Sequence, residues 1–147
     1  MAVLLSRRTL AAGALLFALA GCDRAGTPPA FKAIDITGAE YARELSLPDA
    51  DGNMRSLADF KGKVVVVFFG FTQCPDVCPG TLAELATVKQ RLGADGARVQ
   101  GVFVTIDPER DTPEVLKAYM SSFGADFVAL RGDAAQTAAT AKAFKVY

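Results

Sequence analysis

The segment VVVVFFGFTQCPDVCPGTLAEL, residues 64–85, joins an apolar run to a helical pattern through a loop that contains two cysteines. Val64 to Phe69 are six consecutive apolar residues, mostly β-branched or aromatic, which predicts a strand covered on both faces in a mixed or parallel sheet. We expect this strand to be the centre of the domain, with Cys74 and Cys78 in the loop at its carboxyl end. Beyond Pro79, which suits the first turn of a helix, apolar residues recur at helical spacing at Leu82, Leu85, Val88 and Leu92.

On either side of this segment the chain shows further short strand and helix patterns. Residues 44–47 and 54–57 alternate polar and apolar side chains around the turn sequence PDADGN, which predicts a hairpin. Thr112 is expected to cap a helix that begins with Pro113. The remaining predicted elements are strands at 99–106 and 127–130 and helices at 113–123 and 134–144. The alternation of strands and helices predicts one α/β domain over residues 34–147.

The overall composition is that of a globular protein with little net charge. Of 147 residues, 51% are hydrophobic and 22% are charged, which is enough apolar material to bury a core. The 16 basic and 16 acidic residues cancel. Because no basic surplus is available to neutralise phosphates, nucleic acid is not an expected partner.

The N-terminus has the pattern of an exported lipoprotein. Two arginines at positions 7 and 8 precede an apolar stretch that is too short to span a bilayer comfortably, so residues 1–21 are predicted to be a signal peptide. The sequence Leu19-Ala20-Gly21-Cys22 resembles a bacterial lipobox, which predicts lipidation of Cys22. Residues 22–33 would then be a tether. The expected location is the periplasmic face of a bacterial inner membrane, and the export route stays open.

With Cys22 assigned to lipid, Cys74 and Cys78 remain as a pair in an oxidising compartment. Loops at the carboxyl ends of parallel strands are where α/β folds build their sites. Cys78 is predicted to lie at or just before a helix amino end, where the macrodipole should lower its pKa. Three intervening residues allow the two sulfurs to form a disulfide or to share a metal ion.

Three other chemistries compete for this cysteine pair. A purely structural disulfide closing so small a loop would stabilise the fold little in the chain-entropy model. A structural zinc site needs about four ligands, and the chain has no histidine and no other unassigned cysteine. Val77-Cys78-Pro79 resembles a peroxiredoxin site, but the proline and threonine of that motif would fall at Phe71 and Pro75.

The stretches FFGFTQCPDVCPGTL (residues 68–82) and TIDPERDTPEVLKAY (residues 105–119) resemble the Sco/SenC family of thioredoxin-like copper proteins. The resemblance implies a thioredoxin-like fold of the peroxiredoxin-like subtype with an N-terminal hairpin. It also implies that Cys74 and Cys78 bind copper and cycle through a disulfide as a redox-active pair. The implied partner is cytochrome c oxidase subunit two, or another copper acceptor, to which copper or reducing equivalents would be delivered. Two thiolates suit soft Cu(I) independently of the family.

The chain departs from the family pattern in two respects. The third copper ligand expected from the resemblance is a histidine, and this sequence contains none, so Cu(I) is favoured and Cu(II) binding is expected of a full-length form. We also expect the last strands and helix of the fold to be missing, which would leave one edge of the strand at 64–69 without a neighbour. Asp107, Arg110 and Asp111 match the family signature, but we assign them roles in closing a strand and opening a helix.

These observations favour a metallochaperone over an enzyme. The alternative function is a membrane-tethered thiol-disulfide oxidoreductase that uses the same two cysteines. A third interpretation is a nonfunctional truncated product, which would not accumulate in folded form.

Overall fold

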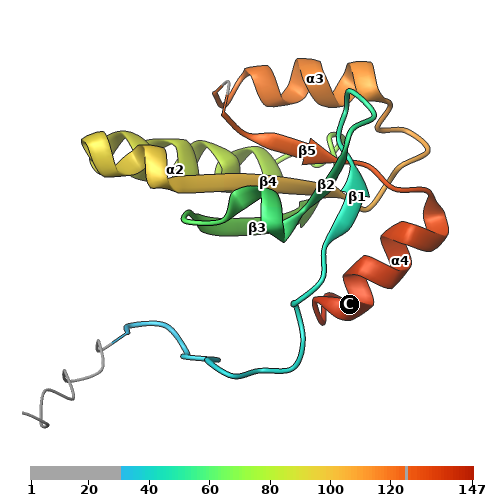
Figure 1. The fold of residues 1–147 in the computed structure, drawn as a ribbon. Coiled ribbons are helices and arrows are strands. Elements are labelled where there is room, and N and C mark those ends of the chain that lie inside the picture. The colour runs from blue at the N-terminus through green and yellow to red at the C-terminus, as the bar shows by residue number, and fades with distance from the viewer. Residues whose placement is uncertain (1–30, 125) are drawn as a thin grey trace, which may run out of the picture. The chain divides into compact units, whose positions relative to one another are not determined.

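The computed structural model describes residues 31–124 and 126–147 (Figure 1). The chain divides into two compact units, one ending at Thr37 and the other running from Gly38 to Tyr147. Cys22 and the predicted signal peptide lie outside the described residues, so their processing stays a prediction. Within the described ranges, no helix has the length and apolar character needed to cross a bilayer.

The described residues of the second unit form five strands, three α-helices and two short 3-10 helices, in the order that the sequence predicts for an opening hairpin followed by an α/β alternation. The strands are β1 (Ser46–Pro48), β2 (Met54–Ser56), β3 (Val64–Gly70), β4 (Val99–Thr105) and β5 (Val128–Leu130). The helices are η1 (Leu57–Phe60), α2 (Val77–Arg91), η2 (Gly93–Arg98), α3 (Pro113–Ser121) and α4 (Ala134–Ala143).

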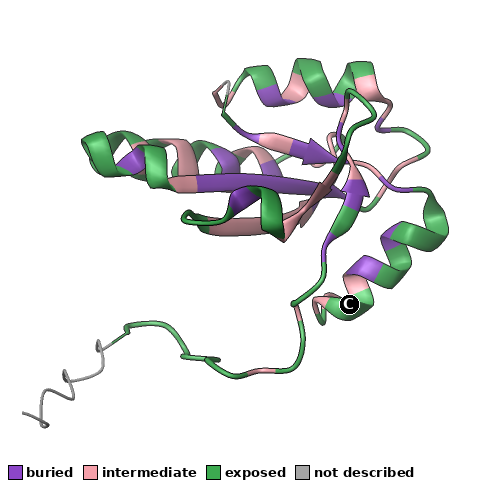
Figure 2. Cartoon of the chain, viewed as in Figure 1, coloured by how far each residue is buried: buried purple, intermediate pink, exposed green. Residues whose placement is uncertain are grey.

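The main sheet is parallel and has the order β3-β4-β5. The chain leaves β3 through α2 to reach β4, then crosses through α3 to β5 on the far side, so β4 gains a neighbour on both edges (Figure 1). The prediction that the strand at 64–69 is central is therefore wrong: β4 is central and almost fully buried, whereas β3 is at the edge and mostly half-buried (Figure 2). Among the described residues, the outer edge of β3 pairs with no strand.

The core is split by the sheet into two clusters, because successive strand residues point to opposite faces. Figure 2 shows the buried residues concentrated on β4 and on the sides of the elements that face it. One cluster joins the sheet to the hairpin and η1 and consists of Leu45, Leu47, Phe60, Val102, Val104 and Leu130. The other joins the sheet to α2 and α3 and consists of Leu82, Phe103, Leu116, Met120, Phe127 and Ala129. This second cluster lies next to the cysteine loop, which is the segment 71–76 between β3 and α2.

The hairpin is fixed to the edge of β5 by its turn. The backbone N–H of Arg131 donates to the carbonyl of Pro48 at 2.9 Å, and Asp49 forms an isolated antiparallel bridge with Leu130. The Asp49 carboxylate accepts the backbone N–H groups of Asp51 and Asn53, each at 2.9 Å. The predicted hairpin is thus confirmed, with an aspartate organising its turn.

Helix boundaries agree with the predicted caps. The Thr112 hydroxyl accepts the backbone N–H of Val115 at 3.4 Å, and Pro113 is the first residue of α3. Pro79 lies in the first turn of α2, which begins at Val77. Cys78 is accordingly the second residue of this helix.

Candidate metal-binding and redox site

The two cysteines flank the junction between β3 and α2. After β3 ends at Gly70, a six-residue loop leads into the helix, and Cys74 lies within it while Cys78 lies in the first helical turn. Cys74 is half-buried and Cys78 is only 5% exposed. Both thiols are free in this structure. The site therefore offers one sulfur to the surroundings and holds the other against the core.

The two cysteines are in direct contact. The backbone N–H of Cys78 donates to the Cys74 sulfur, with 3.3 Å between nitrogen and Sγ. Gly70 leaves room for the Cys78 sulfur, because a Cβ at that position would lie 3.1 Å from the Cys78 Sγ and 2.9 Å from the Phe103 ring. Any larger residue at position 70 would push the buried cysteine or the aromatic ring away.

The two thiols differ in acidity. The pKa of Cys74 is lowered mainly by a hydrogen bond from the Cys78 thiol. Hydrogen bonds from backbone N–H groups at the start of α2 lower it further. Burial is the main cause that raises the pKa of Cys78, and the hydrogen bond to Cys74 and the negative charges of Cys74 and Asp111 add to it. The prediction that the helix amino end lowers the pKa of Cys78 is therefore wrong, and the thiolate forms first on Cys74.

Asp111 fastens the cysteine loop to the sheet. Its carboxylate is completely buried and accepts the Thr72 hydroxyl at 2.6 Å, the Thr72 backbone N–H at 3.1 Å and the Thr105 hydroxyl at 2.5 Å. The predicted role of Asp111 in opening a helix is therefore corrected. Thr112 caps α3, whereas Asp111 joins the cysteine loop to the end of β4. Sequence spacing carries no signal for a contact between Thr72 and a residue 39 positions away.

The other two residues of the signature pair with each other at the surface. Asp107 accepts a hydrogen bond from the Arg110 guanidinium, which raises the pKa of Arg110. The backbone N–H of Asp107 donates to the Thr105 hydroxyl at 3.0 Å, directly after β4 ends. This position agrees with the predicted role of Asp107 in closing a strand.

A half-buried tyrosine on α3, Tyr119, also lies within the electrostatic reach of the site. The Tyr119 hydroxyl is buried without a hydrogen-bond partner in the described part of the chain. Burial, then the charges of Cys78, Cys74 and Asp111, raise the pKa of Tyr119 to about 12. Nothing in the sequence marks Tyr119 as part of the site, because its position in α3 indicates only a core-facing aromatic.

The ligand set on this loop consists of two sulfurs. Within residues 31–124 and 126–147, no group of three or more histidine, cysteine, aspartate or glutamate side chains gathers as a metal cluster would. Two adjacent thiols, one of them acidified, suit a soft monovalent ion of low coordination number such as Cu(I). The Cys74 sulfur lies 3.3 Å from the backbone nitrogen of Cys78 and is hydrogen-bonded by the Cys78 thiol, so the two sulfurs are neighbours.

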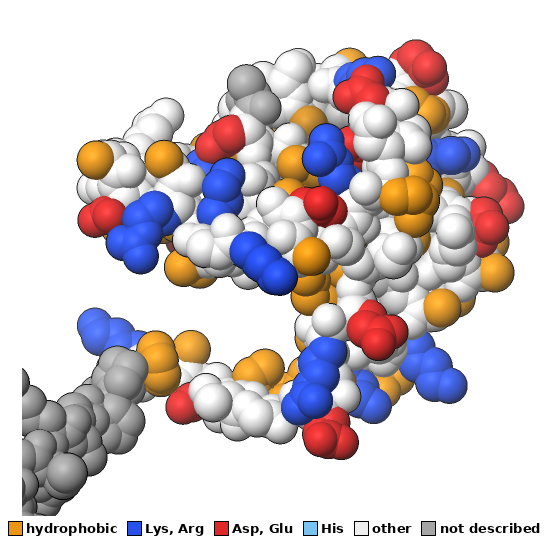
Figure 3. Space-filling view, viewed as in Figure 1, with side chains coloured by type: hydrophobic (Ala, Val, Ile, Leu, Met, Phe, Trp, Pro, Cys, Tyr) orange, Lys and Arg blue, Asp and Glu red, His pale blue; other side chains and the backbone are white. Residues whose placement is uncertain are grey.

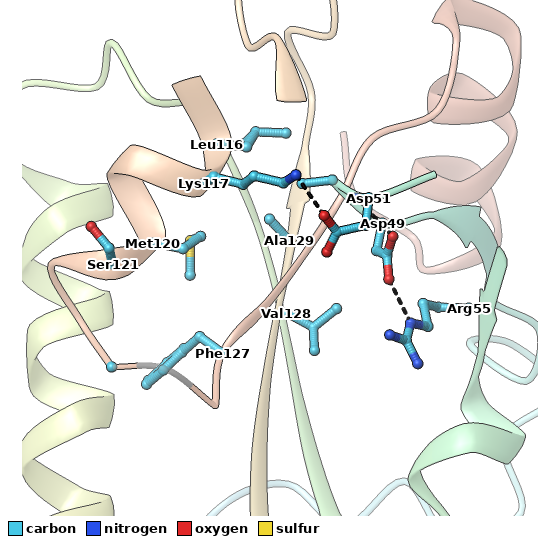
Figure 4. A pocket seen from close by; sticks show the side chains of 12 residues that line it. Asp49, Asp51, Arg55, Leu116, Lys117, Met120, Ser121, Phe127, Val128 and Ala129 are labelled. Atoms are coloured by element: carbon cyan, nitrogen blue, oxygen red, sulfur yellow. Dashed lines mark hydrogen bonds and ion pairs between the residues drawn. The ribbon is translucent and has the colours of Figure 1, made fainter. Parts of the chain in front are cut away.

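A separate hollow of 290 Å³ lies between the hairpin turn, α3 and β5, and neither cysteine lines it (Figure 4). Its floor is apolar and includes Met120. Its charged groups pair across the rim, Asp51 with Lys117 at 2.5 Å and Asp49 with Arg55 at 2.7 Å. Figure 3 shows basic and acidic side chains interspersed on one face of the molecule. Neither feature adds a ligand to the cysteine site.

Comparison with known proteins places the chain in a family. The family model described as SCO1/SenC matches residues 35–147. "Protein SCO2 homolog, mitochondrial" of Bos taurus is 41% identical over 106 residues, which are 71% of this chain and 40% of that protein. The chain thus spans less than half the length of this relative.

Solved structures agree with this assignment. "Structure of Bradyrhizobium japonicum ScoI with copper bound" is 40% identical with a TM-score of 0.66 and covers 71% of this chain and 66% of its own. A structure of BsSco, described as "a member of the Sco family of cytochrome c oxidase assembly proteins" with "a disulfide switch", is 25% identical, has a TM-score of 0.59 and covers 71% and 64%. The fold is the α/β thioredoxin-like fold of these proteins with an N-terminal hairpin. Because the family model matches well over half of this chain, the chain belongs to the SCO1/SenC family.

Proposed function

We propose that this chain is a copper-binding assembly factor that delivers copper or reducing equivalents to the dinuclear copper centre of cytochrome c oxidase subunit two, or to another copper acceptor. The contacts of the Cys74 sulfur with the Cys78 backbone N–H and thiol carry the proposal, because they make two soft ligands neighbours where the loop after β3 enters α2. Membership of a family with a copper-bound Bradyrhizobium japonicum structure supports it.

Copper is cargo at this site, and the two cysteines have different tasks in handling it. Cys78 is buried and fixed by the first turn of α2, so it retains the ion. Cys74 is more exposed and carries the more acidic thiol, so an acceptor's ligand displaces the Cys74 sulfur first. Transfer then proceeds by exchange of one sulfur at a time, and the ion is never released into water.

The proposal also includes the membrane. Lipid on Cys22 and a tether of residues 22–33 would hold the domain at the periplasmic face of a bacterial inner membrane, near a membrane-bound oxidase. Mass spectrometry of the mature N-terminus tests this part. A protein that starts at Cys22 with an attached diacylglycerol supports it, and an unmodified or uncleaved N-terminus refutes it.

A thiol-disulfide oxidoreductase is the second candidate, and the difference in acidity between the two thiols favours it. The Cys74 thiolate would attack a client disulfide, release one client thiolate and form a mixed disulfide. The Cys78 thiol, after losing its proton, would attack the Cys74 sulfur, release the second client thiolate and form the Cys74–Cys78 disulfide. The client gains the two electrons that the pair loses.

Titration with Cu(I) in the presence of a competing chromophoric ligand tests the copper function. A Cys22→Ser background removes the third thiol, and a further Cys74→Ser, Cys78→Ser variant is the matched control. We expect one Cu(I) per chain in the background protein and none held by the control. Equal Cu(I) binding by both proteins would refute the cysteine site.

Insulin reduction separates the two candidate functions. The oxidoreductase requires repeated turnover with a thiol reductant and needs no copper affinity, whereas the assembly factor requires tight Cu(I) binding and little turnover. Robust insulin reduction by a protein that fails the Cu(I) titration would favour the oxidoreductase.

A further inference from the structure

The Tyr119 hydroxyl is buried without a hydrogen-bond partner in the described part of the chain. Buried hydroxyls are nearly always satisfied, because losing water without a replacement is unfavourable. A buried polar group without a partner in one state of a protein therefore suggests a partner in another state. Copper loading changes the charge on the neighbouring sulfurs, so it is the change of state to consider.

Packing links Tyr119 to the buried cysteine through the Phe103 ring. The Tyr119 ring lies between Phe103, with ring centroids 5.9 Å apart, and Phe123, at 5.1 Å. Phe103 in turn borders Gly70, where a Cβ would meet both the Phe103 ring and the Cys78 sulfur. Tyr119 and Cys78 thus approach the same place from α3 and α2, on the same face of the sheet.

The charged groups that act on this hydroxyl are the two cysteine sulfurs and Asp111. Asp111 is close enough for its charge to act on Tyr119, but its two oxygens already accept three donors from Thr72 and Thr105. A neutral thiol is a weak acceptor, whereas a thiolate that binds a metal is an electron-rich one. The acceptor strength of the Cys78 sulfur therefore depends on whether it holds an ion.

We propose that Tyr119 is a positioning residue of the copper site, whose hydroxyl donates a hydrogen bond to the Cys78 sulfur when that sulfur binds Cu(I). This inference rests on the proposed copper function. The hydrogen bond partly neutralises the ligating sulfur in a place that water does not reach, so it favours the loaded state over the dithiol. The same hydroxyl disfavours the unloaded state, because there it is buried without an acceptor.

Tyr119→Phe tests the proposal, since it removes one oxygen and keeps the ring. In the Cys22→Ser background, competition with a Cu(I) chelator should show affinity reduced by about tenfold to 100-fold, as for other groups that hydrogen-bond to metal ligands. The melting temperature of the unloaded, reduced protein should stay level or rise by a few degrees, because an unsatisfied buried group has been removed. A purely structural role would lower that temperature and leave the affinity unchanged.

Thr137→Val is the matched control. The Thr137 hydroxyl is the other buried hydroxyl without a partner among the described residues, and it lines a hollow that contains neither cysteine. Removing it should leave Cu(I) affinity within about twofold of the background protein. A comparable loss of affinity in Thr137→Val would show a general effect of core substitution and overturn the proposal.

The outcomes separate this inference from the function on which it rests. If the background protein holds no Cu(I), the proposed copper function fails, and the inference fails with it. If it holds Cu(I) and Tyr119→Phe holds it equally tightly, only the inference is overturned. Incorporating a fluorinated tyrosine at position 119, which is a stronger donor of nearly the same shape, should restore or exceed the original affinity. If the fluorotyrosine protein bound Cu(I) more weakly than Tyr119→Phe does, the proposed hydrogen bond would be refuted.

Discussion

Replacing Asp111 with asparagine should lower the free energy of unfolding by about 2–4 kcal/mol. The Asp111 carboxylate accepts three hydrogen bonds, two from Thr72 and one from Thr105. An amide has one oxygen, so its NH₂ group must face one of these donors. The Thr105 hydroxyl already accepts the backbone N–H of Asp107 and would lose its own acceptor. Each hydrogen bond to a charged group is worth about 1.5–3 kcal/mol, and relief of the buried charge offsets part of the loss.

Urea denaturation of the reduced protein at neutral pH measures this change as a lower midpoint at an unchanged slope. Asp95→Asn is the matched control: Asp95 and its partner Arg98 are both 71% exposed, so the change should stay within about 0.5 kcal/mol. Since the negative charge of Asp111 helps to raise the pKa of Cys78, Asp111→Asn should also allow alkylation of Cys78 at lower pH. If Asp111→Asn and Asp95→Asn had equal urea midpoints, the claim that the Asp111 carboxylate holds the cysteine loop to the sheet would be refuted.

Three further predictions follow from the thiols and the charged groups. Limiting iodoacetamide at neutral pH should modify Cys74 several times faster than Cys78, as peptide mass spectrometry would show, because the pKa of Cys74 is lowered and that of Cys78 is raised. Burial raises the pKa of Asp49, but hydrogen bonds led by that from Arg55 outweigh it and hold the pKa below its ordinary value. The resulting stabilisation is complete above about pH 4 and is lost as the pH falls through the folded-state pKa, so Asp49→Asn should flatten the acid limb of a stability–pH curve. Lys89→Met should lower the free energy of unfolding by about 2–3 kcal/mol in urea titrations, because the Lys89 side chain is 10% exposed and its ammonium bonds to two backbone carbonyls and the Asp126 carboxylate.

Local elements could be predicted from the sequence because their signals are local. Six apolar residues predicted the strand that β3 forms from Val64, and the Thr112-Pro113 pair predicted the start of α3. The order of strands could not be obtained in this way. β3 and β4 are both apolar enough to be central, and which of them gains two neighbours depends on where the chain goes after Thr105.

The position of the candidate site could be predicted from the sequence, but the side chains that surround its two sulfurs could not. The spacing of Cys74 and Cys78 and their place after an apolar strand predicted a site at the loop, where the structure has them in contact. The groups that surround the cysteines come from distant parts of the chain, namely Asp111 and Tyr119, which are 33 and 41 positions beyond Cys78. No periodicity indicates which side chain of α3 or of the preceding loop meets which sulfur.

The unequal acidity of the two cysteines follows from a competition between the helix amino end and burial. A helix terminus is worth up to about 2 kcal/mol to a nearby anion, which is little more than one pKa unit. Full burial can move a pKa by about 3–5 units. Cys78 lies at the helix amino end and is also buried. Burial has the larger effect on its pKa, because its sulfur faces the core while its own N–H points back to the loop. The helix amino end therefore stabilises an anion on Cys74, which lies outside the helix and receives the N–H of Cys78. A cysteine three residues before a helix can thus be more acidic than one inside its first turn, when the second is the one that packs against the sheet.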